Sequence, residues 1–414
     1  MTPARFQTWA VRLALPLWSE NGFDGRRALF HERLDFSGRP VTLPALRLMV
    51  QARQIATYCR AALRGDCPAG DMALRCLAEV ERRYHRADGA AGWVFSLGPD
   101  GRPADRRRDL YAHAFILFAY AWACRLSGDP GLRRRAADAA TELEAIFRTP
   151  DMGFRDAVPP QDTIRRQNPH MHLLEAWLAL FEATGEDIYR HRATRLAILA
   201  TTRFIDPESG LLLEDFTADW RPLHPAGRNR AEPGHLLEWS WLLHEYVRLC
   251  APRDTQGIGH IARRLHATGL AHATGGMPPV IRNAVGQDGR VVDQGTRIWP
   301  QTELMRSLAM NNPATAVSSG VIARVLAHFA THYIPPHLNG GWIDRLNADG
   351  TTPMDHMPAS SLYHIYGAVC DLTDAAGAGR KDTADTLSPP RHDGNAAGLS
   401  VMRAHGFPDR EGME

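Results

Sequence analysis

A helical repeat of about 62 residues is the feature that most constrains the fold of this chain. Apolar residues recur at three- and four-residue spacing, which predicts helices, over residues 41–64, 109–127, 131–148, 168–183, 187–204, 233–250, 299–310 and 315–333. One polar residue in each of six apolar helices recurs at separations of 60, 59, 63, 66 and 63 residues: Arg53, His113, His172, His235, Gln301 and His364. A unit of this length accommodates two helices and their loops.

Six two-helix units predict an all-α (α/α)6 barrel, with six inner and six outer helices in a closed toroid. An open solenoid of helical hairpins is the alternative architecture. In the closed form the ends of the inner helices converge on one axial cavity, so polar residues at the same point of each repeat would face one another there.

The barrel is expected to be a single domain over residues 1–374. The run from Trp9 to Trp18 is interrupted by Arg12 and Pro16 and is interpreted as the first helix, not as a signal peptide. From residue 375 the composition shifts to Ala, Gly, Asp and Pro, which predicts a flexible tail over residues 375–414 that carries no chemistry. Strand-like runs are short, such as 211–213 and Val291-Val292.

The basic residues exclude several classes of enzyme. All but one of the 48 are arginines, and the single lysine, Lys381, lies in the expected tail. A P-loop, a pyridoxal enzyme and a Schiff-base aldolase all need a lysine in the active site. The 48 basic residues nearly balance 46 acidic ones, so nothing predicts a nucleic acid or an anionic membrane as partner.

The remaining composition predicts a cytoplasmic protein. No stretch of 18 apolar residues occurs, so no segment is expected to span a membrane. The six cysteines include no C-x-x-C pair, and four lie in apolar helical runs, which is typical of reduced core thiols. The protein is expected to be a monomer or homodimer.

Two segments share a local pattern, Asn168-Pro-His-Met-His172-Leu-Leu-Glu175 and Glu232-Pro-Gly-His235-Leu-Leu-Glu238. Each places a proline at a helix start, where it costs no hydrogen bond. Each then places a histidine and a glutamate three residues apart on one helix face. A histidine in the first helical turn lies at the positive end of the helix dipole, which is expected to lower its pKa and favour the neutral, basic form.

A metal site is the alternative interpretation of these histidines, because His and Glu at this spacing are both potential ligands. However, di-iron proteins carry the reverse order, and neither H-E-x-x-H nor a cysteine-rich set occurs. We therefore expect no metal and no cofactor. Six tryptophans lie near helix starts or loops, where they either pack in the core or stack on the C–H face of a sugar: Trp93, Trp177, Trp239, Trp241, Trp299 and Trp342.

As a set, four motifs resemble the N-acylglucosamine 2-epimerase superfamily, over about residues 40 to 372. They are the two His-Leu-Leu-Glu segments, Arg297-Ile-Trp-Pro-Gln-Thr-Glu303 and Tyr363-His364. The resemblance implies an (α/α)6 barrel and a sugar-interconverting enzyme without metal or redox cofactor, such as N-acylglucosamine 2-epimerase, cellobiose 2-epimerase, mannose isomerase or sulfoquinovose isomerase. The motifs are most similar to the mannose isomerase branch.

The resemblance also implies roles for individual residues. His235 and His364 match the two acid/base histidines of the family. Six further positions match residues that bind the sugar or line its cavity: Arg53, Tyr111, Asn168, His172, Glu238 and Trp299. The segment near Ser360 departs from some members, which leaves the substrate and the choice between isomerase and epimerase open.

The leading hypothesis is an isomerase of D-mannose and D-fructose that opens the sugar ring and proceeds through a cis-enediol. His364 would be the base for C2 and C1, and His235 would open the ring. Glu238 would orient His235 or hold a hydroxyl, and Arg53 would stabilise the enediolate. The alternatives are a sugar 2-epimerase of the mannose/glucose or cellobiose type, a glycosidase-like toroid that uses Glu175, Glu238 or Glu303, and an inactive sugar-binding scaffold.

Overall fold

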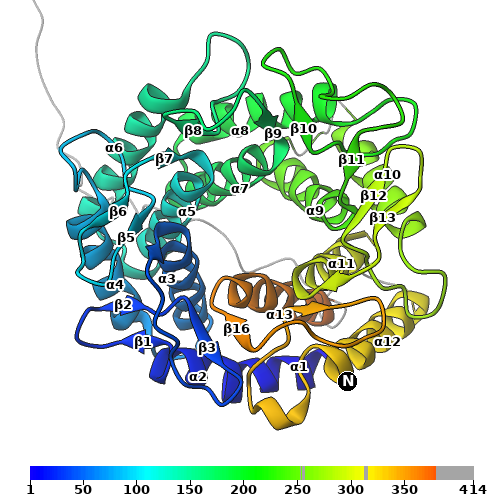
Figure 1. Ribbon diagram of the computed structural model, residues 1–414, viewed down its shortest axis with the longest axis horizontal. Coiled ribbons are helices and arrows are strands. Elements are labelled where there is room, and N and C mark those ends of the chain that lie inside the picture. The colour runs from blue at the N-terminus through cyan, green and yellow to red at the C-terminus, as the bar shows by residue number, and fades with distance from the viewer. Residues whose placement is uncertain (252, 254–256, 312–315, 379–414) are drawn as a thin grey trace, which may run out of the picture.

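Helices alternate between an inner and an outer ring around one axis (Figure 1). The computed structural model describes residues 1–251, 253, 257–311 and 316–378. The inner ring consists of α3 (Leu48–Leu63), α5 (Leu110–Ser127), α7 (Gln167–Thr184), α9 (Pro233–Cys250), α11 (Ile298–Asn311) and α13 (Ser361–Ala378). The outer ring consists of α1 (Pro3–Trp9), η1 (Ala10–Ala14), α2 (Leu15–Glu20), α4 (Gly70–Tyr84), α6 (Pro130–Phe147), α8 (Asp187–Leu199), η2 (Ala200–Phe204), α10 (Ile258–Ala271) and α12 (Ala316–His332).

The ring is closed, as the six-unit prediction requires. The first helix, α1, packs against α13, and α13 packs against α3, so the two ends of the barrel meet. The continuous segment α1–η1–α2 is the outer helix of the sixth unit, and it confirms the helix predicted for the N-terminal run. An open solenoid is therefore excluded.

Burial distinguishes the two rings. The inner helix α5 buries 13 of its 18 residues, whereas the outer helix α4 buries 5 of 15. A helix that is apolar on all sides must be surrounded by protein, and an amphipathic helix needs only one covered face. The sequence of α5, Leu110–Ser127, carries a single charged residue, Arg125, near its end. This composition places α5 inside the ring.

Short strands line the end of the barrel at which the inner helices begin. They are β1 (Phe23–Asp24), β2 (Leu29–Phe30), β3 (Arg33–Asp35), β4 (Leu46–Arg47), β5 (Ser96–Leu97), β6 (Pro103–Asp105), β7 (Arg108–Asp109), β8 (Ala157–Val158), β9 (Arg165–Arg166), β10 (Asp215–Phe216), β11 (Arg230–Ala231), β12 (Ala284–Gly286), β13 (Val291–Asp293), β14 (Thr296–Arg297), β15 (Arg345–Leu346) and β16 (His356–Pro358). A 3-10 helix, η3 (Pro336–Leu338), lies in the last long loop.

Each strand that leads into an inner helix pairs antiparallel with a strand of the next loop along the chain. The pairs are β4·β5, β7·β8, β9·β10, β11·β12 and β14·β15. The strand before α13, β16, pairs with β3, with Met357 opposite Leu34, and this pair completes the circle. A ring of six antiparallel ribbons therefore surrounds the mouth of the barrel at the N-terminal ends of the inner helices.

The structure corrects several predicted boundaries. The helix expected over 41–64 begins at Leu48, because Leu46 and Arg47 pair with β5. The predicted strand at Val291 is β13, but residues 211–213 form no strand. The six-unit repeat requires the outer helices α4 and α10, but no bounds were predicted for them, since only one narrow face of each is apolar. In α4 this face consists of Ala73, Cys76, Leu77, Val80 and Tyr84.

The ends of the chain and the cysteines bear on the other predictions. Residues 375–378 of the expected tail belong to α13, and residues 379–414 lie outside the described residues. All six cysteines are free and five of them are buried, which fits core thiols. Within the part of the chain that the structure describes, no helix has the length and apolarity needed to cross a membrane.

Candidate active site

All eight predicted site residues lie in the first two turns of inner helices, at the mouth of the barrel. Of the six repeat-marking residues, however, two point away from the axis. The ring of His113 donates to the Asp109 carbonyl and accepts from the backbone of Trp93, and the side chain of Gln301 bonds the backbone of Ile281. Both tie an inner helix to an adjacent loop and are structural.

The inward-facing position of those two helices lies two residues later. It is occupied by Phe115 in α5 and by Glu303 in α11. The ring of Phe115 lies 4.6 Å from that of His172, and Glu303 contacts His364. A shift of two residues rotates a helical position through about 200°, from the outer face to the inner one. The repeat therefore locates the inner helices correctly but misplaces two of their six axial residues.

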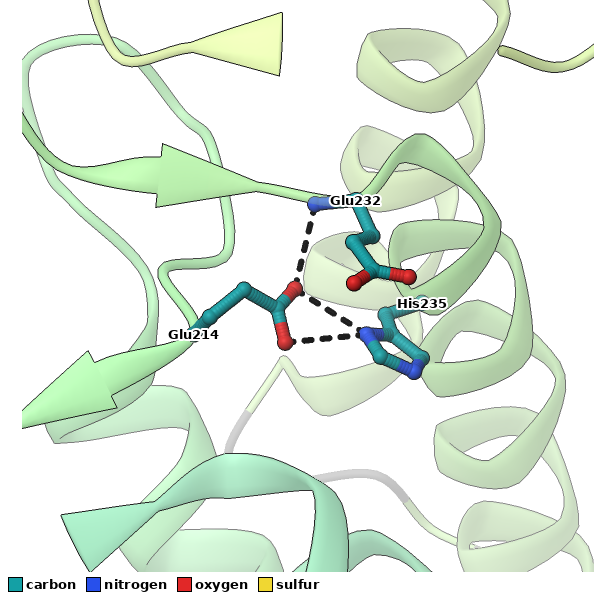
Figure 2. A group of neighbouring side chains, drawn as sticks. All are labelled: Glu214, Glu232 and His235. Atoms are coloured by element: carbon teal, nitrogen blue, oxygen red, sulfur yellow. Dashed lines mark hydrogen bonds and ion pairs between the residues drawn. The ribbon is translucent and has the colours of Figure 1, made fainter. Parts of the chain in front are cut away.

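His235, in the first turn of α9, is held by a buried carboxylate that precedes it in the chain (Figure 2). Its Nδ1 lies 3.0 Å from both oxygens of Glu214 and 3.0 Å from the amide nitrogen of Gln167. Glu214 also accepts from the backbone N–H of Glu232. Nδ1 is thus occupied by the carboxylate, and Nε2 is the atom left for a substrate.

The charge around His235 corrects two predictions. Burial disfavours its charged form, but the Glu214 carboxylate, helped by Glu232, outweighs burial and the helix dipole and raises the pKa of His235 to about 9. His235 is therefore protonated at neutral pH. Glu238 does not orient it, because Glu214 occupies that place. Glu214 ends the short apolar run 211–213 in a loop, and an acid directly after buried leucines was the signal that could have revealed it.

His364, in α13, has the opposite protonation. Its Nδ1 lies 2.9 Å from Oε1 of Glu303, whose other oxygen accepts from Arg306 at 3.0 Å. Burial, with the positive charges of Arg53 and other cations, lowers the pKa of His364 well below its usual value. Its imidazole is therefore neutral at neutral pH, and the causes are burial and nearby cations.

Glu303 and this histidine are joined by one hydrogen bond, whose proton is shared between them only in the sense that either atom can carry it. Burial and the carboxylates of Glu238 and Glu175 raise the pKa of Glu303 against the opposing charge of Arg306. The pKa of the carboxylate is thus raised while that of the imidazole is lowered. When the shared proton lies on Nδ1 of His364, Nε2 is a free base.

Trp299, in the first turn of α11, lies between the two histidines. Its ring centre is 4.8 Å from that of His235 and 5.8 Å from that of His364. Gly234, directly before His235, makes room for this indole: a Cβ at that position would lie 2.7 Å from the Trp299 ring. The Pro-Gly-His order of the motif therefore lets Trp299 pack against the start of α9.

A polar wall faces the histidines from α3, α5 and α7. The guanidinium of Arg53 donates to the Tyr111 hydroxyl at 2.6 Å and to the Ser360 carbonyl at 3.2 Å. Its carbon lies 4.2 Å from the centre of the Phe115 ring. The ring of His172 packs edge-on against Tyr111 at 4.9 Å. Arg53 has no carboxylate partner among the described residues, so its charge remains available to an anion.

Asn168 stands one turn before His172 on α7. Its side-chain oxygen is buried and has no partner within the described part of the chain. A buried polar atom without a hydrogen bond is costly, and a bound polyol would supply one.

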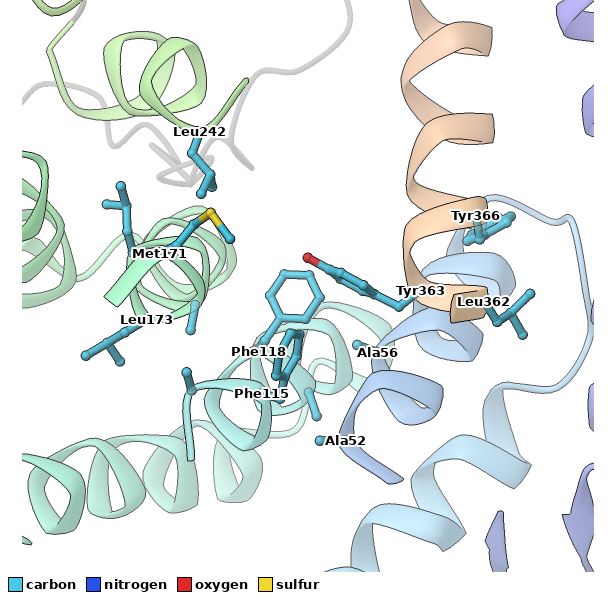
Figure 3. Packing of buried hydrophobic residues seen from close by; sticks show 14 of the residues in the cluster. Ala52, Ala56, Phe115, Phe118, Met171, Leu173, Leu242, Leu362, Tyr363 and Tyr366 are labelled. Atoms are coloured by element: carbon cyan, nitrogen blue, oxygen red, sulfur yellow. The ribbon is translucent and has the colours of Figure 1, made fainter. Parts of the chain in front are cut away.

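The floor of the site is a layer of aromatic and charged side chains. Tyr363 reaches from α13 toward α5, with its ring 5.4 Å from Phe115 and 5.7 Å from Phe118 (Figure 3). Its hydroxyl donates to Glu175, which also bonds Nδ1 of His172 at 3.2 Å. This layer separates the mouth from a second cavity at the other end of the barrel.

Two groups in the site combine carboxylates with a histidine and could hold a cation. They are Glu214, Glu232 and His235, and Glu238, Glu303 and His364, whose ligand atoms lie within 4.8 Å of one another in each group. Neither is the His-x-x-Glu pair that the sequence suggested as a metal motif. In both, the described contacts already pair the histidine with a carboxylate.

Known proteins resemble this chain over most of its length. Residues 29–368 match the sequence profile of N-acylglucosamine 2-epimerase (GlcNAc 2-epimerase). A mannose-6-phosphate isomerase of Rhizobium meliloti (strain 1021) is 36% identical over 380 residues, which are 88% of this chain and 95% of that protein. A D-mannose isomerase of Thermobifida fusca is 33% identical over 51% of this chain and 54% of its own.

A solved structure resembles the whole barrel. The crystal structure of a D-mannose isomerase superposes with a TM-score of 0.80 at 21% identity, covering 89% of this chain and 97% of its own. At this identity the likeness shows the fold, which is the predicted (α/α)6 barrel.

Proposed function

Because this chain belongs to the N-acylglucosamine 2-epimerase family, we propose that it is a sugar isomerase that interconverts D-mannose and D-fructose. The observation that carries the proposal is the pair of histidines beside Trp299, one protonated and one neutral. An aldose–ketose isomerase needs one acid to open the ring and one base to move the proton.

Ring opening uses His235. As an imidazolium it donates the Nε2 proton to the ring oxygen, the C1–O5 bond breaks, and a solvent water molecule takes the proton of the anomeric hydroxyl, which yields the open-chain aldehyde. Glu214 holds the other nitrogen and stabilises the positive charge before the transfer. Trp299 offers an apolar face on which the C–H face of the sugar stacks.

Isomerisation uses His364. Its Nε2 takes the proton from C2, the electron pair of that bond forms the C1–C2 double bond of a cis-enediol, and the C1=O π electrons move to O1. The C2 hydroxyl then passes its proton to O1 and becomes the carbonyl, while Nε2 delivers a proton to C1. The proton on Nε2 can exchange with solvent before it is delivered. Arg53 has no carboxylate partner among the described residues, and its charge stabilises the developing enediolate oxygen. Asn168, His172 and Glu238 are assigned to the sugar hydroxyls.

The test is product analysis on free mannose and on a disaccharide, followed by NMR in D₂O. We expect fructose as the first product from mannose, with deuterium entering C2 of the recovered mannose. Free glucose as the first product would contradict the isomerase.

A 2-epimerase is the second candidate, and the two histidines are the observation that favours it. Epimerisation delivers a proton to the opposite face of C2 and needs a base on each side, whereas isomerisation needs one. Replacing each histidine separately distinguishes the two reactions. If either replacement stops C2 exchange in only one direction, both histidines act on C2 and the epimerase is correct.

The glycosidase and scaffold alternatives lead to different products. A glycosidase would release a monosaccharide from the disaccharide, and its carboxylates would be free for the glycosidic bond. Here Glu303 is engaged by His364 and Arg306, and Glu175 by His172 and Tyr363. An inactive scaffold would bind sugar equally well after loss of His364.

The proposal includes a reaction without metal or other cofactor, a monosaccharide as the only substrate, a monomer or homodimer, and a cytoplasmic location. It is supported by two histidines that suffice for enolisation. After dialysis against EDTA we expect an unchanged rate. If EDTA lowers the rate and added zinc or manganese restores it, a cation is bound by one of the two carboxylate–histidine groups.

A further inference from the structure

Arginines stand just before the start of five of the six inner helices, so a series of arginines borders the mouth of the barrel. Four of the five have a carboxylate within hydrogen-bond distance: Arg47 with Glu32 at 2.7 Å, Arg108 with Asp88 at 2.6 Å, Arg166 with Asp162 at 2.6 Å, and Arg230 with Glu232 at 2.7 Å. The fifth, Arg297, is exposed and has no ion pair with any described residue.

Arg297 faces the mouth. It lies on β14, where the preceding Thr296 bonds the hydroxyl of Tyr333 on the outer side at 2.6 Å. Successive side chains of a strand point to opposite faces, so Arg297 points away from Tyr333, on the exposed face of the ribbon. Its charge acts on the pKa of both His364 and Tyr111, which come from two other inner helices.

A second arginine lies beside it. Arg345 on β15 is the direct antiparallel partner of Arg297, so both side chains share one face of the ribbon. Only Asp293 is near, 3.6 Å from Arg345, and this pair is half-exposed. Like charges placed directly opposite each other destabilise a sheet unless an anion lies between them.

We propose that Arg297 and Arg345 bind the phosphate of a hexose 6-phosphate whose C1–C2 end lies between His235 and His364. This inference rests on the proposed isomerase and names its substrate class. Two guanidiniums on one face of a ribbon offer several N–H donors that match the oxygens of a phosphate. Arg53 is the cation nearer the reacting carbons, because it bonds the Ser360 carbonyl directly before α13, which carries His364, and the Tyr111 hydroxyl on α5. Arg297 is therefore available to bind the 6-phosphate, at the opposite end of the sugar from C1 and C2.

The test compares mannose with mannose 6-phosphate in steady-state kinetics of wild type, Arg297→Gln, Arg345→Gln and the control Arg290→Gln. Arg290 is an exposed arginine of the neighbouring β12–β13 turn, and its loss changes the total charge equally. We expect wild type to prefer the phosphorylated sugar. Arg297→Gln should lower kcat/KM for mannose 6-phosphate roughly 10–100-fold, mainly through KM, and change that for mannose less than about threefold.

Arg345→Gln should cause a smaller selective loss, and Arg290→Gln should leave the preference unchanged. Equal losses on both sugars, an unchanged preference in Arg297→Gln, or the same loss in Arg290→Gln would each overturn the inference. Calorimetric binding of mannose 6-phosphate and mannose to His364→Asn separates this inference from the proposed function. Tighter binding of the phosphosugar that Arg297→Gln abolishes supports the arginines even where turnover is absent, and equal binding of both sugars refutes them.

Discussion

The two ends of the barrel contain the same kinds of side chain and use them differently. The end at which the inner helices terminate holds a cavity of about 900 Å³, lined by aromatic residues and five arginines. Each of these arginines has a carboxylate within 3.2 Å: Arg60 and Arg306 with Asp371, Arg64 with Asp374, Arg125 with Glu182, and Arg248 with Glu245. At the mouth, Arg53 and Arg297 have none among the described residues.

The difference separates structural charge from functional charge. Ion pairs at the far end satisfy each other, and aromatic rings cover them, as where Arg306 lies 3.6 Å from the ring centre of Trp241. At the mouth the charges do not cancel, and two histidines have pKa values shifted in opposite directions. Size alone does not identify the site, because a spacious cavity also exists at the far end.

Loss of His364 gives the largest expected effect. His364→Ala should lower kcat for mannose roughly 10²–10⁴-fold and abolish C2 exchange, because it removes the base. His235→Ala should slow turnover of the cyclic sugar comparably while leaving some exchange on the open-chain form. Deuterium wash-in measured by NMR checks both, with circular dichroism as the control for folding. C2 exchange at the wild-type rate in His364→Ala would assign the base elsewhere.

The pH dependence should show what Glu214 contributes. The acid form of His235 is present below its pKa of about 9 and lost above it. Neutral His364 has a lowered pKa and persists below pH 6.5. The pH profile of wild-type activity should therefore be broad, and activity should fall on the alkaline side near pH 9. Glu214→Gln removes the charge that raises the pKa of His235, while burial remains to lower it.

The alkaline limb of the pH–activity profile of Glu214→Gln should consequently shift to lower pH. The variant should lose roughly 10–100-fold in activity at pH 8 and less at pH 6. The matched control is Glu182→Gln at the far end, which should keep the wild-type profile. A pH profile of Glu214→Gln that merely scales down in parallel would show that the carboxylate acts on structure and not on protonation.

Packing at the mouth should matter less than charge. Gly234→Ala places a methyl group 2.7 Å from the Trp299 ring, so the indole or the start of α9 must move. We expect a loss of about 1–3 kcal/mol in stability and a several-fold fall in kcat/KM, measured by thermal unfolding and steady-state kinetics. Gly276→Ala, with open space around its Cβ, is the control. Unchanged kinetics would show that the packing of Trp299 beside the histidines does not contribute to catalysis.

The far end should give the smallest effect. Arg248 is half-exposed and paired with Glu245 and Glu182. Arg248→Gln should change stability by less than about 1 kcal/mol and leave kcat/KM within twofold for both sugars. A tenfold loss in turnover would show that the two ends communicate and that the separation drawn between them is wrong.

The barrel fold and the two histidines could be predicted from the sequence because both are encoded by residues that are close together in the chain. The period of the apolar residues is a property of neighbouring positions, and it assigned the six inner helices even though it took His113 and Gln301 for axial residues. The bounds of outer helices such as α4 were not assigned because one apolar face among arginines and glutamates gives a weak periodic signal. The catalytic residues came from motifs that resemble a family.

The sequence by itself therefore determined the ring of helical hairpins and the presence of two histidines at helix starts. Only the tertiary structure decided their protonation, since Glu214 approaches His235 from 21 residues away and Glu303 approaches His364 from 61. It also decided which arginines of the mouth are neutralised. Helical periodicity follows from the backbone geometry of adjacent residues. The pKa of a buried group depends on charges that distant loops and helices bring within a few ångströms, and no local pattern records those distances.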